Sequence, residues 1–395
     1  MAVDAPVSDG SRLERLLRYL QSDPGNATLL ADAAAAAFDA RDFDQAAALL
    51  GRLAAIGPLA ANMVNLAGLV ALAQQRFGDA AAILEGLRAG GRDDAALRFN
   101  LAWAKAMTGQ WQGALDLLSD EAVAASARGP SLKIQMMHHL DMLDEALACG
   151  AQLAERYPDN QALMGALATV ALDAKNPDIA LAYAQRAGED GEGRAALGIL
   201  TLGQYDTATS LALFDSALAR QPRNPRAWVG KGLGLLAAGD AAAGAEAIDR
   251  GAELFREHLG SWIASGWAHF INGDYAKARA SFERSLAIDD TFAEAHGGLA
   301  VLDIVAGKLD EAKRRCDIAL RLDRNCFGGA LAKVLLLERS GHSELAQKIR
   351  EVALNTPIGP NGQTIVQAMA GFGRSPRTQD RTRRANPQSG GTKIS

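Results

Sequence analysis

The chain has 395 residues, of which 49% are hydrophobic and 5% aromatic, and its formal net charge is −5. No stretch approaches the roughly 18 consecutive apolar residues that a membrane helix needs, so we expect no membrane span. The N-terminus lacks the features of a signal peptide and the three cysteines form no paired framework, which together predict a cytoplasmic location.

The first element expected is a helix over about residues 11–22, which we interpret as a half-repeat within the N-terminal segment 1–26. Pairs of helices are expected to follow, each beginning near one of these residues: Ala27, Ala61, Ala95, Ala127, Gln161, Gly191, Pro225, Leu259, Ala293 and Phe327. Two pairs follow their predecessors early, after 32 residues at Ala127 and after 30 residues at Gly191. We interpret the segment 188–193 either as a softer joint between two half-arrays or as a tightened turn.

A fixed interval of 34 residues runs through the C-terminal half of the sequence. Glycines recur at this interval in the turns between paired helices, at Gly239, Gly273, Gly307 and Gly341. Self-similarity at a period of about 20–50 residues marks stacked repeats, because a single helix pair cannot bury its own apolar face. Runs rich in β-branched and aromatic residues are almost absent, so no sheet is expected.

The unit beginning at Leu259 has the most complete version of the repeated pattern. Its first helix contains Trp262 and the small residue Gly266, and its second helix contains Ala278 and Phe282. This pattern resembles the tetratricopeptide repeat family, whose signature joins an aromatic and a small residue in the first helix to A-x3-F in the second.

The resemblance covers about residues 11–356 and implies the fold. We expect an all-α, right-handed α-solenoid of about ten stacked helix-turn-helix units over residues 27–356, in which each unit contacts only its neighbours. A capping helix over 357–372 and a disordered basic tail over 373–395 are expected to follow. The tail holds six basic residues and one acidic residue, which leaves the rest of the chain acidic and argues against nucleic-acid binding.

No catalytic, metal-binding or cofactor-binding pattern stands out in the sequence. His138 and His139 are adjacent, so they point to different sides of a helix and cannot chelate a metal as an i, i+4 pair would. The glycines of segment 230–234 lie inside an expected helix and do not match a phosphate-binding loop. We therefore expect no enzyme activity, no metal and no cofactor.

The resemblance implies a concave groove lined by the first helix of each unit. Transferred to this sequence, the groove positions include Phe99, Trp103, Gln135, His138, Leu233, Ile263, Trp267, Phe270 and Val301. These residues are mostly apolar and include no basic cluster that would hold an acidic peptide tail. They favour an apolar extended or helical segment as ligand. The alternative is that several of them pack between adjacent helices.

The leading functional hypothesis is a non-catalytic scaffold or chaperone-like adaptor that binds an apolar segment of a partner protein. Proteins of this family commonly serve bacterial secretion, pilus or exopolysaccharide assembly, and the resemblance implies a role of that kind. Two alternatives stay open. The chain is either a substrate-recognition subunit for an enzyme on a separate chain, such as a glycosyltransferase, or a self-assembling scaffold that forms a homo-oligomer.

Overall fold

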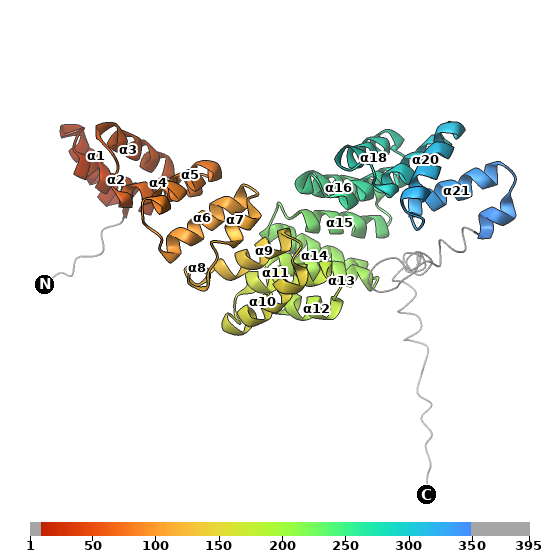
Figure 1. Cartoon of the computed structure of the whole chain (residues 1–395), viewed down its shortest axis with the longest axis horizontal. Helices are drawn as coiled ribbons and strands as arrows, with labels where there is room; N and C mark the ends of the chain where they lie inside the picture. Colours follow the sequence, from red (N-terminus) through yellow and green to blue (C-terminus); the bar gives the residue numbers. More distant parts are fainter. Residues whose placement is uncertain (1–8, 349–395) are drawn as a thin grey trace, which may run out of the picture. The chain divides into compact units, whose positions relative to one another are not determined.

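The computed structural model describes residues 9–348, and every regular element in that range is a helix (Figure 1). The chain divides after Val170, within α11 (Gln161–Asp173), into two compact units. No helix of the described range is long and apolar enough to cross a membrane. The segments 357–372 and 373–395, for which we expected a capping helix and a disordered tail, lie outside the described residues.

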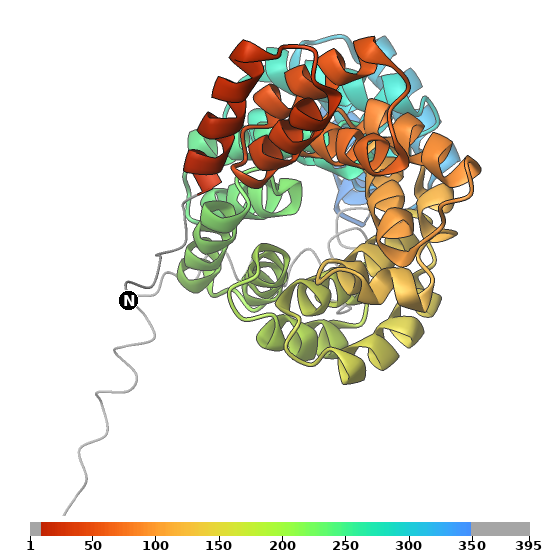
Figure 2. The ribbon, with the colours of Figure 1, turned by 90° about the vertical axis from the view of Figure 1, so that its left-hand side faces the viewer.

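The first unit is a stack of helices in which sequence neighbours pack against each other, as the red and orange ribbons in Figure 2 show. Its helices are α1 (Asp9–Ser22), α2 (Ala27–Asp39), α3 (Phe43–Ile56), α4 (Ala61–Ala73), α5 (Phe77–Ala89), α6 (Ala95–Met107), α7 (Trp111–Leu115), α8 (Asp120–Ala124), α9 (Gly129–His139), α10 (Leu143–Arg156) and most of α11 (Gln161–Asp173). The helix α1 packs against α2, where the buried side chains of Leu13 and Leu20 join Leu30 in one apolar cluster.

The second unit repeats the same helix-turn-helix arrangement. Its helices are α12 (Pro177–Arg186), α13 (Gly191–Gly203), α14 (Thr207–Arg220), α15 (Pro225–Ala237), α16 (Ala241–Phe255), α17 (Leu259–Ile271), α18 (Tyr275–Ile288), α19 (Ala293–Val305), α20 (Leu309–Leu322) and α21 (Phe327–Arg339). Residues 343–348 are also helical. We call the first helix of each pair helix A and the second helix B.

Every turn between helix A and helix B contains one residue in the left-handed region, with φ between +57° and +90°. These residues are Arg41, Gln75, Gly109, Asp141, Lys175, Tyr205, Gly239, Gly273, Gly307 and Gly341. Glycine adopts this conformation without steric cost, whereas other residues do so at a cost in free energy. The glycine interval is therefore visible mainly in the C-terminal half, although the turn itself recurs throughout the described pairs.

An aspartate directly after the left-handed residue begins several of the B helices. Asp42, Asp206, Asp240 and Asp274 each accept a hydrogen bond from the backbone N–H three residues further along. Such a cap satisfies one of the free N–H groups of the first turn and stabilises a helix by about 1 kcal/mol. The turn and the cap together explain why helix B starts at a fixed position in these pairs.

Glycines on helix A allow the close packing that the sequence pattern predicted. The ring of Phe282 on α18 is fully buried between Gly266 of α17 and Gly298 of α19. A Cβ atom added at Gly298 would lie 2.5 Å from that ring, which is closer than side chains approach in proteins. One aromatic ring thus joins its own pair to the next, and the fully buried Phe214 on α14 does the same.

The third pair departs from the regular pattern. Its helix B is broken into α7 and α8, and Ser119 caps α8. The following helix A begins at Gly129, two residues after the expected Ala127, whereas the other nine A helices begin at the expected residues. Gly129 lies directly against the backbone of Val123, so only a residue without a side chain fits there.

Residues 187–190 form a short turn between α12 and α13, and the rest of the segment 188–193 already belongs to α13. The Asp190 carboxylate accepts hydrogen bonds from the N–H groups of Glu192 and Gly193, and this cap begins α13. Gly193 lies against the side chain of Ala187, where a side chain of its own would not fit. The division between the two compact units falls within α11 instead of in this segment.

Candidate functional site

One position of helix A is the centre of the predicted groove. It lies six residues before the left-handed turn residue, and its occupants are Ala35, Leu69, Trp103, Gln135, Thr169, Ile199, Leu233, Trp267, Val301 and Leu335. Most of these side chains are half-buried, so each presents part of its surface outside the helix pair. Seven of the ten are larger than alanine and apolar. We call this set the groove row.

The remaining predicted residues lie on the same helix face, because spacings of three and four residues bring side chains together on a helix. Phe99 and Ile263 precede the groove row by four residues, and His138 and Phe270 follow it by three. Phe99 is buried, whereas Ile263, His138 and Phe270 are half-buried.

In the first unit the row contains Trp103 and Gln135, both half-buried. The guanidinium group of Arg128 lies over the Trp103 ring, 5.2 Å from its centroid. Arg128 stands at the start of α9, the next helix A, so this cation–π contact bridges two neighbouring pairs. Trp103 therefore has a partner within the protein and still keeps part of its surface accessible.

In the second unit Trp267 is surrounded by aromatic rings. Its ring centroid lies 5.7 Å from that of Phe270, 5.3 Å from Phe282 and 5.6 Å from Phe327, each in an edge-to-face arrangement. Phe327 begins α21, which is two A helices further along the chain. The indole is half-buried by these contacts, so it serves helix packing and leaves only part of its surface to a ligand.

Val301 differs from the rest of the row because it is fully buried. The neighbouring helix α21 packs directly on α19, where Gly297 lies against the backbone of Gly328 and Gly329. The carboxylate of Glu294 on α19 accepts hydrogen bonds from the first N–H groups of α21, at 2.6 and 2.9 Å. A fully buried side chain offers no surface to a ligand, so we leave Val301 out of the candidate surface.

Leu233 on α15 is the most accessible member of the row. Its side chain is 41% exposed, and the nearby groove-face residues Val229 and Leu236 are half-buried. Gly230 and Gly232 of the same helix contact Phe214 and Ile248, so α15 is held closely on its other sides. The backbone of α15 is thus fixed while Leu233 remains free to contact another molecule.

A buried polar network lies behind the groove row in the second unit. The Asp249 carboxylate accepts a hydrogen bond from the Ser265 hydroxyl at 2.6 Å and lies 2.8 Å from Nε2 of His269. The Ser265 hydroxyl also lies 2.8 Å from the hydroxyl of Ser281. In a catalytic serine–histidine pair, the serine hydroxyl forms a hydrogen bond with the imidazole. Here both groups bind the same carboxylate instead, and this arrangement ties α16, α17 and α18 together.

Sequence reasoning missed this network, although the sequence does contain a signal for it. Acidic residues recur at intervals of 34 on successive B helices, at Asp215, Asp249, Glu283 and Asp317. Asp215 forms an ion pair of 2.6 Å with Lys231 of the next helix A. The recurring acid thus bonds a polar residue on the following helix A at two successive pairs.

Two further sets of ion pairs connect helices in the second unit. Buried Asp303 on α19 lies 2.6 Å from Arg279 and 3.1 Å from Arg315, which belong to the two flanking B helices. Asp173, at the end of α11, accepts two hydrogen bonds from Arg226 at 2.8 and 3.0 Å. These arginines are engaged within the protein, which reduces their availability as anion-binding groups.

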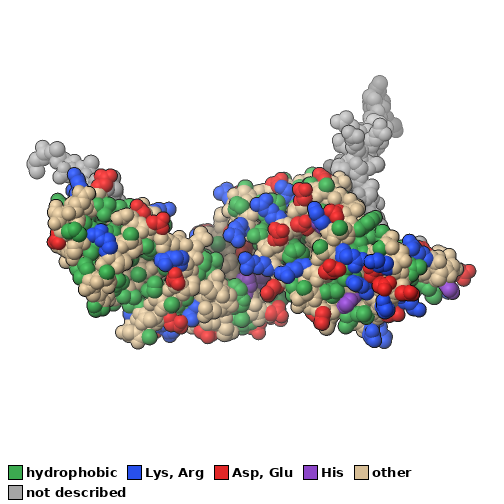
Figure 3. Space-filling view, turned by 90° about the horizontal axis from the view of Figure 1, so that it is seen from above, with side chains coloured by type: hydrophobic (Ala, Val, Ile, Leu, Met, Phe, Trp, Pro, Cys, Tyr) green, Lys and Arg blue, Asp and Glu red, His purple; other side chains and the backbone are tan. Residues whose placement is uncertain are grey.

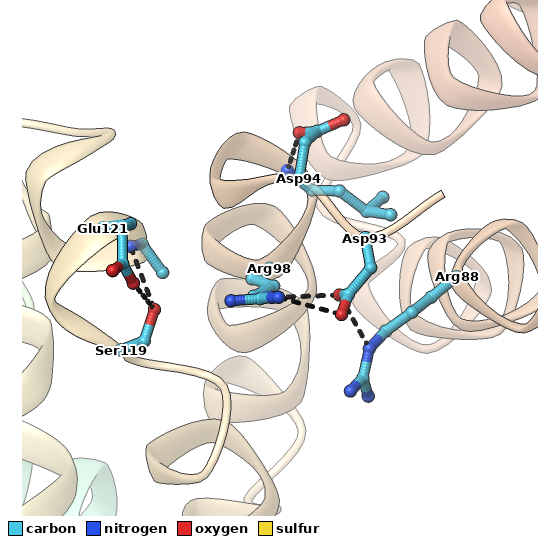
Figure 4. A network of polar contacts seen from close by, with 8 residues as sticks. Arg88, Asp93, Asp94, Arg98, Ser119 and Glu121 are labelled. Carbon is cyan, nitrogen blue, oxygen red and sulfur yellow. Dashed lines mark hydrogen bonds and ion pairs between the residues drawn. The ribbon is translucent and has the colours of Figure 1, made fainter. Parts of the chain in front are cut away.

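A charged network also joins α5 to α6 in the first unit (Figure 4). Asp93 accepts two hydrogen bonds from Arg98, at 2.9 and 3.0 Å, and one from Arg88 at 3.0 Å. Hydrogen bonds from Arg98, with a further contribution from Arg88, lower the pKa of Asp93 to about 2. On the molecular face in Figure 3, acidic and basic side chains intermingle, so that face presents no single-sign surface of the kind that nucleic acid binds.

The rings of the adjacent His138 and His139 have centroids 6.1 Å apart and planes at 33°. His139 stacks on Trp111, with ring centroids 4.2 Å apart and planes at 11°, and burial lowers the pKa of His139. Within residues 9–348, no group of three or more His, Cys, Asp or Glu side chains is placed to hold a metal ion. Burial raises the pKa of Cys316 to about 11 and that of Cys326 to about 12, so these thiols are poor nucleophiles at neutral pH.

Solved structures that resemble this chain share little of its sequence. The structure titled functional characterization of Pseudomonas aeruginosa pilF is 16% identical over 49% of this chain and 90% of that chain, with a TM-score of 0.40. The Cut9–Hcn1 hetero-tetramer of the APC/C is 14% identical over 81% and 85%, with a TM-score of 0.40. The MamA protein is 18% identical over 42% and 91%, with a TM-score of 0.35.

Comparison with curated proteins gives no match. Two family models, both described as tetratricopeptide repeat, match residues 31–91, 65–130, 196–257, 230–291 and 269–333. Together these matches span residues 31–130 and 196–333, which is more than half of the 395 residues. The chain therefore belongs to the tetratricopeptide repeat family.

Proposed function

We propose that the chain is a non-catalytic cytoplasmic adaptor that binds an apolar, helical segment of a partner protein along its groove row. Repeats of this family make a protein-interaction scaffold, and the proposal adds the chemistry of the partner. The observation that supports it is the run of large apolar side chains that remain partly exposed at one position of successive A helices. The role in bacterial secretion, pilus or exopolysaccharide assembly belongs to the same proposal and rests on the resemblance alone.

An amphipathic helix with an apolar face suits the groove row better than an acidic peptide does. Side chains at i, i+3, i+4 and i+7 of an amphipathic helix make one apolar stripe, and such a stripe binds by laying its apolar face into a hydrophobic groove. The row itself contains no lysine or arginine in any described pair. An acidic peptide tail would therefore find no paired charge there.

The proposed contact is centred on α15 in the second unit. Leu233 is the most exposed residue of the row, and Ile199 and Trp267 occupy the equivalent positions on the preceding and following A helices. The next member of the row after Trp267 is Val301, which α21 covers completely. We therefore place the partner segment over α13, α15 and α17.

Site-specific photo-crosslinking tests this placement in cells of the native host. A photoreactive amino acid replaces Leu233 in one variant and Leu322, a comparably exposed leucine on helix B α20, in the control. We expect the first variant alone to capture one defined protein, through a segment with apolar residues at spacings of three and four. Equal capture by both variants, or capture through charged segments without that spacing, would contradict the proposal.

A further inference from the structure

Four large apolar side chains are exposed in two successive pairs of the second unit, at the turns between helix A and helix B. Ile271 and Tyr275 flank the turn at Gly273, and they are 63% and 46% exposed. Val305 and Leu309 flank the next turn, 34 residues further along, and they are 44% and 42% exposed. We call these four residues the turn strip. Exposed apolar side chains that gather in one place mark interaction sites, unlike single exposed ones.

The repeat geometry makes the turn strip continuous. Tyr275 stands two residues after one left-handed turn residue, and Val305 stands two residues before the next. The same two positions in the first unit are Trp111 and His139, whose rings stack with centroids 4.2 Å apart. In that place the two positions of neighbouring pairs are in contact. In the second unit the ring of Tyr275 lies 5.6 Å from that of Phe270 in its own pair and is still 46% exposed. Because the repeat sets Val305 at the position that His139 occupies, we infer that the four residues follow one another in one row, in the order Ile271, Tyr275, Val305 and Leu309.

Other pairs do not repeat this feature. Ile271 and Val305 stand two residues before the left-handed turn residue. In five other pairs a small or charged residue occupies this position: Asp39, Ala73, Asp173, Gly203 and Ala237. Met107 is exposed at the same position, but its helix B begins with Trp111, which His139 partly covers. Among the described pairs, only these two successive ones have large, exposed apolar residues on both sides of the turn.

The charges beside the turn strip have opposite signs in the two pairs. Asp274 in the first pair corresponds to Lys308 in the second, because they are 34 residues apart. Lys277 corresponds in the same way to Glu311. All four flank the strip at the start of a B helix, and Lys277 and Glu311 have exposed side chains. Within the chain Lys277 lies 3.8 Å from Asp274, and Glu311 lies 2.9 Å from Arg314, in pairs that solvent reaches. A sign reversal at two equivalent positions makes the surface complementary in charge to a second copy of itself in reversed order.

We propose that the turn strip is the contact surface between two copies of this chain, related by a two-fold axis. A two-fold axis perpendicular to the strip places the same patch of each copy against the other in reversed order. The pair containing Ile271 and Tyr275 of one copy then faces the pair containing Val305 and Leu309 of the other. In that arrangement Asp274 of each copy lies opposite Lys308 of the other, and Lys277 opposite Glu311.

The same charges disfavour a parallel contact. If like pairs faced each other, Asp274 would lie opposite Asp274 and Lys308 opposite Lys308, and like charges at a contact repel. The antiparallel contact replaces each repulsion with an attraction while it buries the four apolar side chains. Because only four large apolar side chains from each copy make the contact, we infer a dimer that dissociates on dilution.

Sedimentation velocity of the full chain over a wide concentration range tests the proposal. We expect a concentration-dependent monomer–dimer equilibrium. Substituting Val305→Lys and Leu309→Lys together is expected to weaken dimerisation at least tenfold, because it places charges in the apolar contact. Both side chains are exposed, so the fold does not depend on them. The matched control is Ile56→Lys, which places a lysine at a similarly exposed apolar site of the first unit and leaves the equilibrium unchanged.

A charge exchange tests the two-fold arrangement separately. Lys277→Glu alone and Glu311→Lys alone each set like charges opposite each other and weaken the dimer, whereas the double variant restores opposite charges and recovers it. A chain that stays monomeric, or a dimer that Val305→Lys with Leu309→Lys leaves intact, overturns the proposal. If the double variant dimerises no more strongly than either single variant, the antiparallel arrangement is wrong.

Discussion

The indole ring of Trp267 meets the ring of Phe282 edge to face, with centroids 5.3 Å apart and planes at 73°. Phe282 is the buried ring that joins α17 to α19, so this contact connects the groove row to the core between the pairs. A residue that the sequence placed in the groove thus also supports helix packing.

This relationship gives a quantitative prediction for Trp267→Ala. Replacing a core tryptophan by alanine lowers the free energy of unfolding by about 3–5 kcal/mol. The indole of Trp267 is only half-buried, so we expect a loss near the lower end of that range. Urea unfolding of the variant measures the free energy, and hydrogen exchange locates the loosening in α17 to α21. The control Leu233→Ala is expected to cost about 1 kcal/mol or less, because the side chain is 41% exposed. A cost below that of the control would show that Trp267 is not part of the core.

The left-handed turn residues predict a stabilising substitution. Arg41 adopts φ of +61°, where a residue with a side chain costs about 1–2 kcal/mol more than glycine. We expect Arg41→Gly to raise the free energy of unfolding by about 0.5–1 kcal/mol, since the entropy that glycine loses on folding offsets part of the gain. The neighbouring Ala40 has φ of −75°, so Ala40→Gly is the control and is expected to destabilise. Equal effects of the two substitutions would contradict the explanation.

The carboxylate network around Asp93 predicts a pH dependence. Because the pKa of Asp93 in the folded protein is near 2 and lies below its usual value of 3.8, its stabilising contribution is present above pH 4. This contribution is lost as the pH falls from about 4 towards 2. Nuclear magnetic resonance titration of the Asp93 carboxyl group measures the pKa, and Arg98→Gln is expected to raise it. An unchanged pKa in that variant would rule out Arg98 as the main cause.

The buried network at Asp249 predicts a loss of stability that the sequence did not indicate. Asp249→Ala removes the acceptor for Ser265 and the partner of Nε2 on His269, and each buried polar group left unpaired costs about 1–3 kcal/mol. The exposed Glu246 lies on the same helix, and Glu246→Ala is expected to change stability by less than about 0.5 kcal/mol. Thermal and urea unfolding of the two variants give the comparison. Similar values for both would contradict a structural role for the network.

The repeat fold could be predicted from the sequence because its determinants are local. Glycines such as Gly273 occupy left-handed turns, and small residues such as Gly266 occupy close approaches, so both recur with the repeat. The break between α7 and α8 has no such signal. Gly129 lies against the backbone of Val123 beside the break, but a single glycine outside the repeat interval does not predict where a helix is interrupted.

The groove was harder to predict than the fold, because accessibility depends on neighbouring helices. Leu233 and Val301 occupy the same position of helix A, yet one is 41% exposed and the other is fully buried. The difference arises at Gly297, which lets α21 lie directly on α19. A sequence position therefore identifies the helix face, whereas the packing of the next helix A decides whether a ligand can reach it.

The most direct test of the proposed function is a paired measurement of partner affinity and melting temperature for Leu233→Glu. A charge at the centre of an apolar contact opposes binding, whereas an exposed position tolerates it in the folded protein. We expect at least a tenfold loss of affinity for the crosslinked partner segment, with the melting temperature unchanged. Leu322→Glu, at a similarly exposed leucine on α20, is expected to bind as the unmodified chain does. If Leu233→Glu retains full affinity, the partner does not bind along the groove row.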